Sequence, residues 1–206
     1  MPLLVIISAT SWAIPFLAGV LAFKRLGPET RILVSYFALL GLVDVFGVYL
    51  ALNKINNIWL FHLFTPLEYG FLVMVFSYWQ RRSLLRLLLR VSIPLFVLIC
   101  IVSKLFVEDL VSFDSFTSSL ESWALILISI YTLLALHRDK SSPILGMPRF
   151  WIAAAVLIYF SGNIPIFAFA NIAAVWPINH VLNIISNMLF AGGFLCCHLN
   201  YRVYGV

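Results

Sequence analysis

Strongly polar side chains interrupt several long apolar blocks of this sequence, and their types could bind a proton, a cation or a polar ligand. An ionisable side chain at membrane depth costs free energy, so a carboxylate or histidine in such a block predicts a functional site. Asparagine and threonine add hydrogen-bonding groups beside them. We therefore predict a ligand-binding set made of Asp44, His62, Thr65, Glu68, Glu121, Asn163, His180, Asn183 and Asn187.

The clearest spacing lies in the last apolar block, where His180, Asn183 and Asn187 follow one another at helical intervals. In an α-helix these intervals place side chains on one face, and Asn179 and Ser186 flank that face. Two interpretations remain open. The face could line a ligand or water cavity, or it could hold helices together through interhelical hydrogen bonds.

The segment NNIWLFHLFTPLEYG combines a histidine, a proline and a glutamate. Pro66 cannot donate a backbone hydrogen bond to the carbonyl of His62, so we expect a kink in this helix. Thr65 lies between His62 and Glu68, and a kinked helix could present all three to one cavity. The alternative for Glu68 is a protonated carboxyl group that hydrogen-bonds to the helix at 32–52 or at 178–201.

A second interruption is expected in FWIAAAVLIYFSGNIPIF. Pro165 leaves the carbonyl of Ser161 without its usual helical partner, next to Gly162 and Asn163. Irregular backbone at membrane depth is tolerated where it faces protein or a wet cavity. Together with the His62–Glu68 segment, this predicts a polar pocket in the outer half of the protein. Pro15 predicts a simple kink in the first block.

The elements that carry these residues are seven apolar blocks. Hydrophobic residues make up 63% of the chain and charged residues 10%, whereas an ordinary soluble domain has roughly 45–50% and about 25%. We therefore predict an all-α polytopic integral membrane protein with one seven-helix domain over 1–206, and we exclude nucleic-acid binding. Nothing predicts a cofactor or a metal site. The expected helices lie near 2–23, 32–52, 58–79, 91–107, 120–136, 150–171 and 178–201.

The loop charges predict an orientation. Of the 13 lysines and arginines, all but Lys54 and Lys104 fall in the first, third and fifth loops or in the tail. Basic residues are typical of cytoplasmic loops, whereas the fourth loop carries Glu108, Asp109 and Asp114. We therefore expect the N-terminus outside and the C-terminus in the cytoplasm.

The third loop, RRSLLRLLLR, is the most basic part of the chain. Its arginines at 82, 86 and 90 are spaced as one stripe of a helix, with leucines opposite. Two interpretations are open: the arginines hold anionic lipid headgroups, or they bind a cytoplasmic partner. The predicted lipid or partner contacts are Arg81, Arg82, Arg86 and Arg90.

Four stretches together resemble a group of small bacterial seven-helix integral membrane proteins whose activity is not established. They are NNIWLFHLFTPLEYG, the LES at 120–122, FWIAAAVLIYFSGN and NHVLNIISNMLF. Similar helix blocks occur beside or fused to sensor histidine kinases. The resemblance implies sensing, a signalling partner and a location in the bacterial inner membrane, but it assigns no role to any residue. The architecture is also similar to rhodopsins, although the last block has no lysine that could hold retinal.

Three classes of function are compatible with these patterns. The first is a sensory module that binds a small molecule or lipid in the outer pocket. The second is a small proton-coupled transporter in which Glu68 and Asp44 titrate, although the chain has no internal repeat. The third is an intramembrane metal hydrolase with His62, His180 and one carboxylate as ligands, although no HExxH motif is present.

Overall fold

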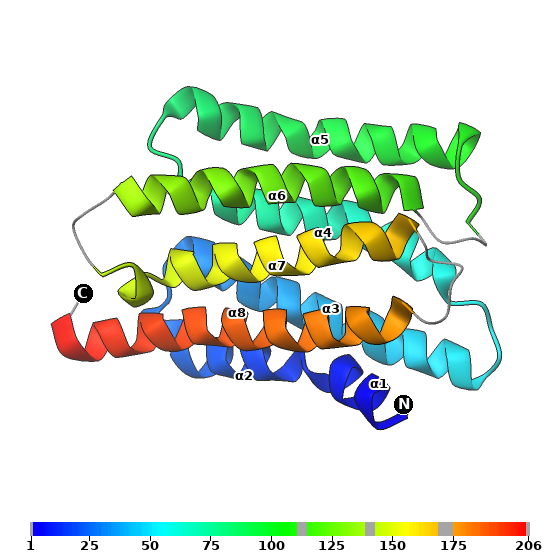
Figure 1. The fold of residues 1–206 in the computed structure, drawn as a ribbon, viewed down its shortest axis with the longest axis horizontal. Helices are drawn as coiled ribbons and strands as arrows, with labels where there is room; N and C mark the ends of the chain where they lie inside the picture. The colour runs from blue at the N-terminus through cyan, green and yellow to red at the C-terminus, as the bar shows by residue number, and fades with distance from the viewer. Residues whose placement is uncertain (1, 111–114, 139–142, 169–174, 205–206) are drawn as a thin grey trace.

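The computed structural model describes residues 2–110, 115–138, 143–168 and 175–204, where the chain forms α-helices joined by short connections (Figure 1). Two 3₁₀ turns, η1 (Phe23–Arg25) and η2 (Ile144–Gly146), precede α3 and α7. The α-helices are α1 (Pro2–Thr10), α2 (Ala13–Ala22), α3 (Pro28–Leu52), α4 (Ile58–Trp79), α5 (Ser83–Phe106), α6 (Ser115–Arg138), α7 (Pro148–Ala168) and α8 (Trp176–Tyr204).

Within the described residues, 7 helical stretches are long and apolar enough to cross a membrane, which confirms the number of helices predicted from the sequence. The first stretch contains α1, α2 and η1 in succession, and each of the others is a single helix. The stretches are Leu3–Arg25, Pro28–Leu52, Ile58–Trp79, Ser83–Phe106, Ser115–Arg138, Pro148–Ile166 and Trp176–Cys197.

Two helices begin well before the positions expected from hydropathy. We expected the fourth helix near 91–107, but α5 begins at Ser83. We expected the fifth near 120–136, but α6 begins at Ser115 and ends at Arg138. Polar residues at a helix end lower the local hydropathy without opposing the helix, because long charged side chains extend toward water. Of the expected helix at 150–171, residues 169–171 lie outside the described ranges.

The first spanning stretch is broken between α1 and α2. Pro15 has no backbone N–H, so it cannot donate to the carbonyl of Ser11. That carbonyl instead accepts a hydrogen bond of 3.1 Å from the N–H of Ile14. The kink expected at Pro15 is therefore present.

The two other prolines with an expected irregularity, Pro66 and Pro165, do not end the helices that hold them, and the kink expected at Pro66 stays a prediction. α4 continues through Pro66 and α7 continues through Pro165. The expectation of broken backbone at 161–165 was therefore wrong. A proline inside a helix removes one hydrogen bond, and a single missing bond need not end the helix. Ser161 keeps a further local bond, because its Oγ donates to the carbonyl of Leu157 at 2.6 Å.

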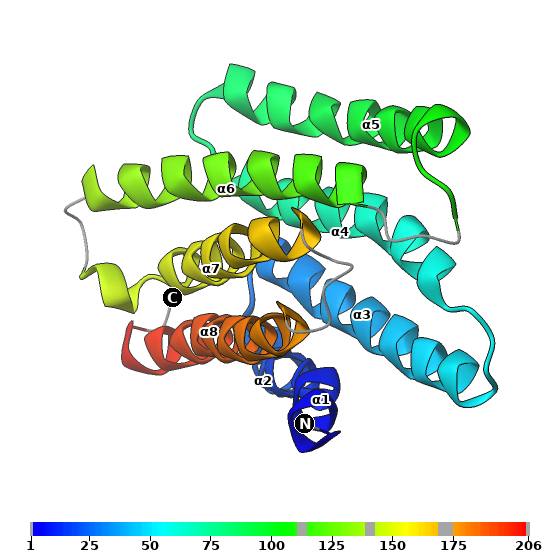
Figure 2. The same cartoon turned by 45° about the vertical axis from the view of Figure 1, so that its right-hand side comes forward.

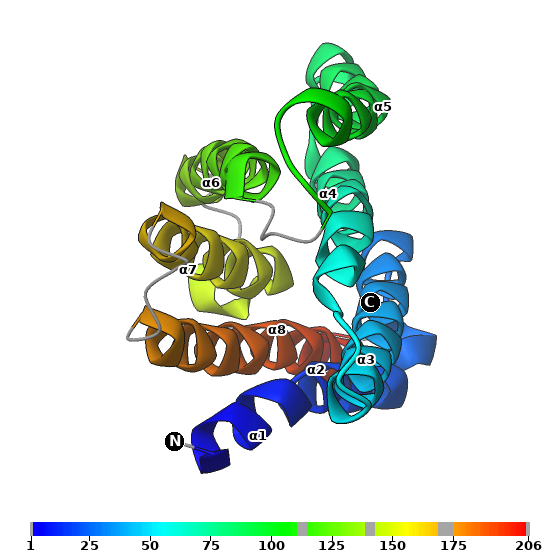
Figure 3. The ribbon, with the colours of Figure 1, turned by 90° about the vertical axis from the view of Figure 1, so that its right-hand side faces the viewer.

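The helices form a layered bundle (Figure 2 and Figure 3). α7 packs between α6 and α8, and α8 also packs against α1 and α2. α3 packs against α2 and α4, and α4 also contacts α5 and α6. α5 lies at the edge of the bundle, where α4 is its main neighbour. The order α3, α4, α6 and α7 thus forms a continuous series of packed neighbours across the bundle.

Apolar side chains fill the core and also cover the outside. Leu33, Val73 and Phe194 are fully buried, whereas Leu21 is 82% exposed and Phe106 is 81% exposed. Large contiguous apolar surfaces are rare on monomeric soluble proteins, and lipid accepts them without cost. The outer surface therefore supports an integral membrane protein.

The start of α1 and the end of α8 lie at opposite ends of the bundle (Figure 1). The α3–α4 and α5–α6 connections lie at the end with the N-terminus. The other end, which we call the basic end, carries η1, the α4–α5 connection and the start of α7. Arginines occur at each of these three places, as Arg25, Arg81 and Arg149.

Candidate functional site

Glu68 of α4 is held by a tyrosine from the neighbouring helix. The Tyr36 hydroxyl of α3 donates a hydrogen bond of 2.5 Å to Oε1 of Glu68. Tyr36 is 5% exposed, and its ring stacks on Phe64 with centroids 6.1 Å apart. A short bond to a carboxyl group in apolar surroundings is a strong interhelical contact. It corresponds to the alternative that we gave for Glu68, a hydrogen bond to the helix at 32–52.

Tyr159 of α7 is the residue that three intramembrane carboxyl groups share. It interacts electrostatically with Glu68 of α4, Asp44 of α3 and Glu121 of α6, and its hydroxyl also interacts with the side-chain amide of Asn163. Tyr36 interacts in the same way with Glu68, Tyr159 and Glu121. We call Asp44, Glu68 and Glu121 the acidic cluster. These residues come from α3, α4, α6 and α7, and each carboxyl group interacts electrostatically with at least one of the two tyrosines.

The acidic cluster has no lysine or arginine on its own segments. Neither residue type occurs in residues 32–53, 55–80 or 105–137, nor in residues 150–201 of the two last helices. Glu121 is only 2% exposed, and taking an ionised carboxyl group out of water costs free energy that its neighbours must offset. His62 of α4 is also buried, with 4% of its surface exposed. Protonation of a carboxyl group, or a cation nearby, would lower the cost of its burial.

A cavity of ≈ 160 Å³ between α3 and α4 contains one member of the acidic cluster. Asp44 is half-buried at this cavity, whereas Glu68 and Glu121 do not line it. Asn57 crosses from the start of α4, where its Nδ2 donates to the carbonyl of Gly47 at 3.1 Å. The lining consists of Val43, Asp44, Gly47, Val48, Asn57, Leu60 and Phe61.

The polar face of α8 packs against the break between α1 and α2. Asn183 Nδ2 lies 3.1 Å from both the carbonyl and the Oγ of Ser8, and Asn187 Nδ2 donates to Ser11 Oγ at 2.7 Å. Asn187 also donates to Asn183 Oδ1 at 3.3 Å. These bonds satisfy polar groups at the end of α1, as the interhelical interpretation of this face requires. They join α8 to the end of α1 and the residue that follows it.

The remaining predicted residues lie between these two groups. Asn163 of α7 is fully buried, and its Oδ1 accepts a hydrogen bond of 2.9 Å from Asn179 of α8. Thr65 is buried on α4, where its Oγ1 donates to the carbonyl of Phe61 at 3.0 Å. His180 is half-buried near the start of α8. Of the predicted set, Asp44, Glu68, Glu121 and Asn163 interact with Tyr159, and Asn183 and Asn187 join α8 to α1, whereas His62, Thr65 and His180 belong to neither group.

The arginines of the third loop fold back on α4. Arg86 donates to the carbonyl of Gln80 at 2.8 Å, and Arg90 Nε donates to Ser77 Oγ at 3.4 Å. The Arg90 guanidinium also lies 5.4 Å from the centre of the Tyr78 ring. Arg82 precedes α5 in an extended conformation, so it is not part of the helical stripe with Arg86 and Arg90. Arg81, Arg82, Arg86 and Arg90 are all exposed, so all four remain the predicted lipid or partner contacts.

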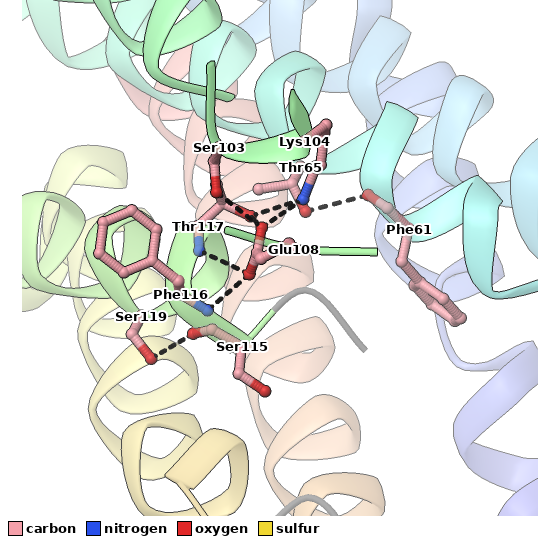
Figure 4. A network of polar contacts seen from close by, with 9 residues as sticks. All are labelled: Phe61, Thr65, Ser103, Lys104, Glu108, Ser115, Phe116, Thr117 and Ser119. Carbon is pink, nitrogen blue, oxygen red and sulfur yellow. Dashed lines mark hydrogen bonds and ion pairs between the residues drawn. The ribbon is translucent and has the colours of Figure 1, made fainter. Parts of the chain in front are cut away.

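A separate polar network joins α5 to α6 at the N-terminal end of the bundle (Figure 4). Glu108 Oε2 lies 2.5 Å from Lys104 Nζ, and Glu108 Oε1 accepts from the N–H groups of Phe116 and Thr117 at 2.7 and 3.2 Å. Those N–H groups belong to the first turn of α6, which favours a negative charge. Burial raises the pKa of Glu108, but the bonds from Lys104, Phe116 and Thr117 outweigh it and lower that pKa overall.

Sequence reasoning missed the tyrosines and serines that complete both groups. Tyr36 and Tyr159 carry one polar atom on a large ring, so in an apolar block they resemble interfacial anchors. Ser8 and Ser11 are weakly polar and give no indication of a partner. The signal that was available is the position of Tyr159 in the middle of the block at 150–171, whereas Tyr36 lies only four residues after the start of the block at 32–52.

In its described residues the chain is an all-α protein with seven helical stretches able to span a membrane, and its acidic cluster combines the buried Glu121 with the half-buried Asp44 and Glu68. In the described part of the chain, no group of three or more His, Cys, Asp or Glu side chains is placed to hold a metal ion. Comparisons of the chain with protein-family models, with curated proteins and with solved structures gave no match.

Proposed function

We propose that this chain is a membrane-embedded sensory or binding module whose acidic cluster responds to a small positively charged ligand. The observation that carries the proposal is Asp44, a half-buried carboxyl group at a cavity of ≈ 160 Å³ between α3 and α4, in segments without lysine or arginine. A cation relieves the cost of buried negative charge, which gives binding a driving force that a neutral ligand lacks. Aromatic rings near the site add favourable contacts with a cation.

The same proposal includes an orientation and a partner. The N-terminus faces outside and the basic end faces the cytoplasm, because arginines and lysines gather there. A ligand would thus reach the bundle from outside, and Arg81 and Arg82 at the basic end would contact anionic lipids or a signalling protein. A bacterial inner membrane is the location that the resemblance implies.

A proton-coupled carrier is the second candidate. It is favoured by the electrostatic link through Tyr159, which connects carboxyl groups on α3, α4 and α6. Such groups can exchange a proton when a substrate binds. The protein would then transport a ligand across the membrane and not only sense its presence. Uptake of the ligand into vesicles that contain the purified protein would distinguish the two functions.

The test of cation selectivity is a thermal-shift series on the purified protein in detergent at neutral pH. The compounds are matched sets of protonated amines, neutral alcohols and carboxylates of similar size. We expect the amines alone to raise the unfolding temperature, and the triple variant Asp44→Asn/Glu68→Gln/Glu121→Gln to lose this response. Equal responses to all three compound classes, or an unchanged response of the triple variant, would contradict the proposal.

A further inference from the structure

Of the three residues of the acidic cluster, Asp44 alone lines the cavity between α3 and α4, and this cavity is a space that a ligand can occupy. Its volume is ≈ 160 Å³, and Asp44 is its only carboxylate. Cavities of about 150 Å³ with apolar walls are large enough to bind a benzene ring. Glu68 and Glu121 belong to the same electrostatic group, but they do not line this cavity.

The walls of the cavity are mostly apolar. Val43 and Val48 of α3 and Leu60 and Phe61 of α4 supply hydrophobic surface. Such walls favour an apolar ligand body, whereas a fully hydrated inorganic ion would gain little from them. The Phe61 ring also offers a face to a nearby positive charge.

The polar groups of the cavity are hydrogen-bond acceptors, so they favour a ligand head group that can donate hydrogen bonds. Asp44 is acceptor-only when ionised, and the Asn57 side chain adds an amide oxygen because its Nδ2 already donates to Gly47. A primary or secondary ammonium group can donate to both oxygens. A quaternary ammonium group cannot donate, and an alcohol lacks the charge.

The distance of Asp44 from the end of α3 indicates how a bound ligand would be oriented. Asp44 is eight residues before Leu52, the end of α3, so it lies about 12 Å along the helix axis from that end. Asn57 precedes α4 at the same end of the bundle. The cavity therefore runs from near the membrane surface to a carboxylate below it, which suits a free amine with a small apolar body.

We propose that the cavity formed by Val43, Asp44, Gly47, Asn57, Leu60 and Phe61 binds a protonated primary or secondary amine with a ring-sized apolar body. Asp44 contacts the ammonium group, and the ring lies against Leu60 and Phe61. Glu68 and Glu121 respond to the added charge through Tyr159 without touching the ligand. This inference rests on the proposed function, because it specifies which cation the module binds and where.

The probe is benzylamine, and its matched controls are benzyl alcohol and benzyltrimethylammonium. Binding to the purified protein in detergent is measured by ligand-observed NMR titration at neutral pH, where benzylamine is protonated. We expect benzylamine to bind at least about tenfold more tightly than either control, since a charge-assisted hydrogen bond distinguishes it. Equal affinity for benzylamine and benzyl alcohol would overturn the inference.

Two variants test the position of the site. Asp44→Asn keeps the shape of the side chain and removes its charge, and we expect it to weaken benzylamine binding by about tenfold or more. Gly47→Val fills the cavity, and Gly47→Ala is the milder version. A Cβ at position 47 makes only ordinary contacts, 3.7 Å to Leu60 Cδ1 and 3.8 Å to Asn57 Nδ2, so the alanine variant should fold normally.

The outcomes separate this inference from the proposed function. Benzylamine could bind with an affinity that Asp44→Asn and both Gly47 variants leave unchanged. The binding site would then not be this cavity, whereas the proposal that the protein binds a cation would stand. If no amine binds to the wild-type protein, both fail. Asp109→Asn removes an exposed carboxyl group outside both the cavity and the acidic cluster, so it is the control, and we expect it to change benzylamine affinity by less than about threefold. A loss equal to that of Asp44→Asn would show that overall charge, and not the cavity, decides the affinity, and it would overturn the inference.

Discussion

The hydroxyl of Tyr36 lies 2.5 Å from Oε1 of Glu68, and this single hydrogen bond joins α3 to α4 in the interior of the bundle. Its position explains how a carboxyl group can exist at this depth. The bond satisfies one oxygen of Glu68, while the ring of Tyr36 stays packed on Phe64. Any variant that removes one partner therefore leaves the other partner buried without its bond.

The first prediction concerns this pair. Tyr36→Phe and Glu68→Leu should each lower the free energy of unfolding by about 1–3 kcal/mol, because each strands a buried polar group. Glu68→Gln keeps an acceptor oxygen and should cost less than Glu68→Leu. Thermal unfolding of the purified variants measures the effects. The double variant Tyr36→Phe/Glu68→Leu should cost less than the sum of the single variants, and strict additivity would show that the two side chains do not interact.

The second prediction concerns the contact between α8 and the broken first stretch. Asn183→Leu and Asn187→Leu should each cost about 0.6–2 kcal/mol, which is the range for interhelical hydrogen bonds in membranes. They should also increase proteolysis near Ser11, since α1 loses its partners on α8. Met188→Leu is the matched control, because Met188 is adjacent to Asn187 but 49% exposed. A control that destabilises as much as Asn187→Leu would argue against this account.

The third prediction is a pH dependence at Glu108. Its pKa is lowered in the folded protein, so its contribution to stability is complete above the ordinary glutamate value of 4.5 and is lost as the pH falls through the lowered value. The groups that face it are Lys104 of α5, the first turn of α6 and the neighbouring Asp109. Thermal unfolding of wild type and Glu108→Gln should differ at neutral pH and converge in acid. A constant difference across this pH range would refute the prediction.

The fourth prediction is the orientation. In a variant with Cys100, Cys196 and Cys197 replaced by alanine, a cysteine placed at Asp109 should react with an impermeant thiol reagent in intact cells. A cysteine placed at Ser83, at the basic end, should react only after the membrane is opened. Both native side chains are exposed, so burial does not limit either reaction. The reverse labelling pattern would place the N-terminus inside.

Composition predicts the fold class well because the hydrophobic effect acts on whole segments, and seven long apolar blocks allow few architectures. Hydropathy does not indicate that α5 begins at Ser83, because Arg86 and Arg90 lower the mean hydropathy of its first turns. In the structure these arginines are accommodated by contacts with Gln80 and Ser77. The polar residues were found because they are rare in such blocks. Their grouping could not be derived, since the side chain that Asn183 or Glu68 meets depends on helix rotation and on weakly polar partners such as Ser8 and Tyr36.

The most direct test of the central claim is difference infrared spectroscopy of the carboxyl groups on addition of benzylamine to the protein in lipid. If a cation neutralises the acidic cluster, its binding should convert at least one protonated carboxyl group to a carboxylate. That spectral change should be absent from the triple variant Asp44→Asn/Glu68→Gln/Glu121→Gln. Benzylamine binding with no change in the carboxyl bands, or with the same change in the triple variant, would contradict the account.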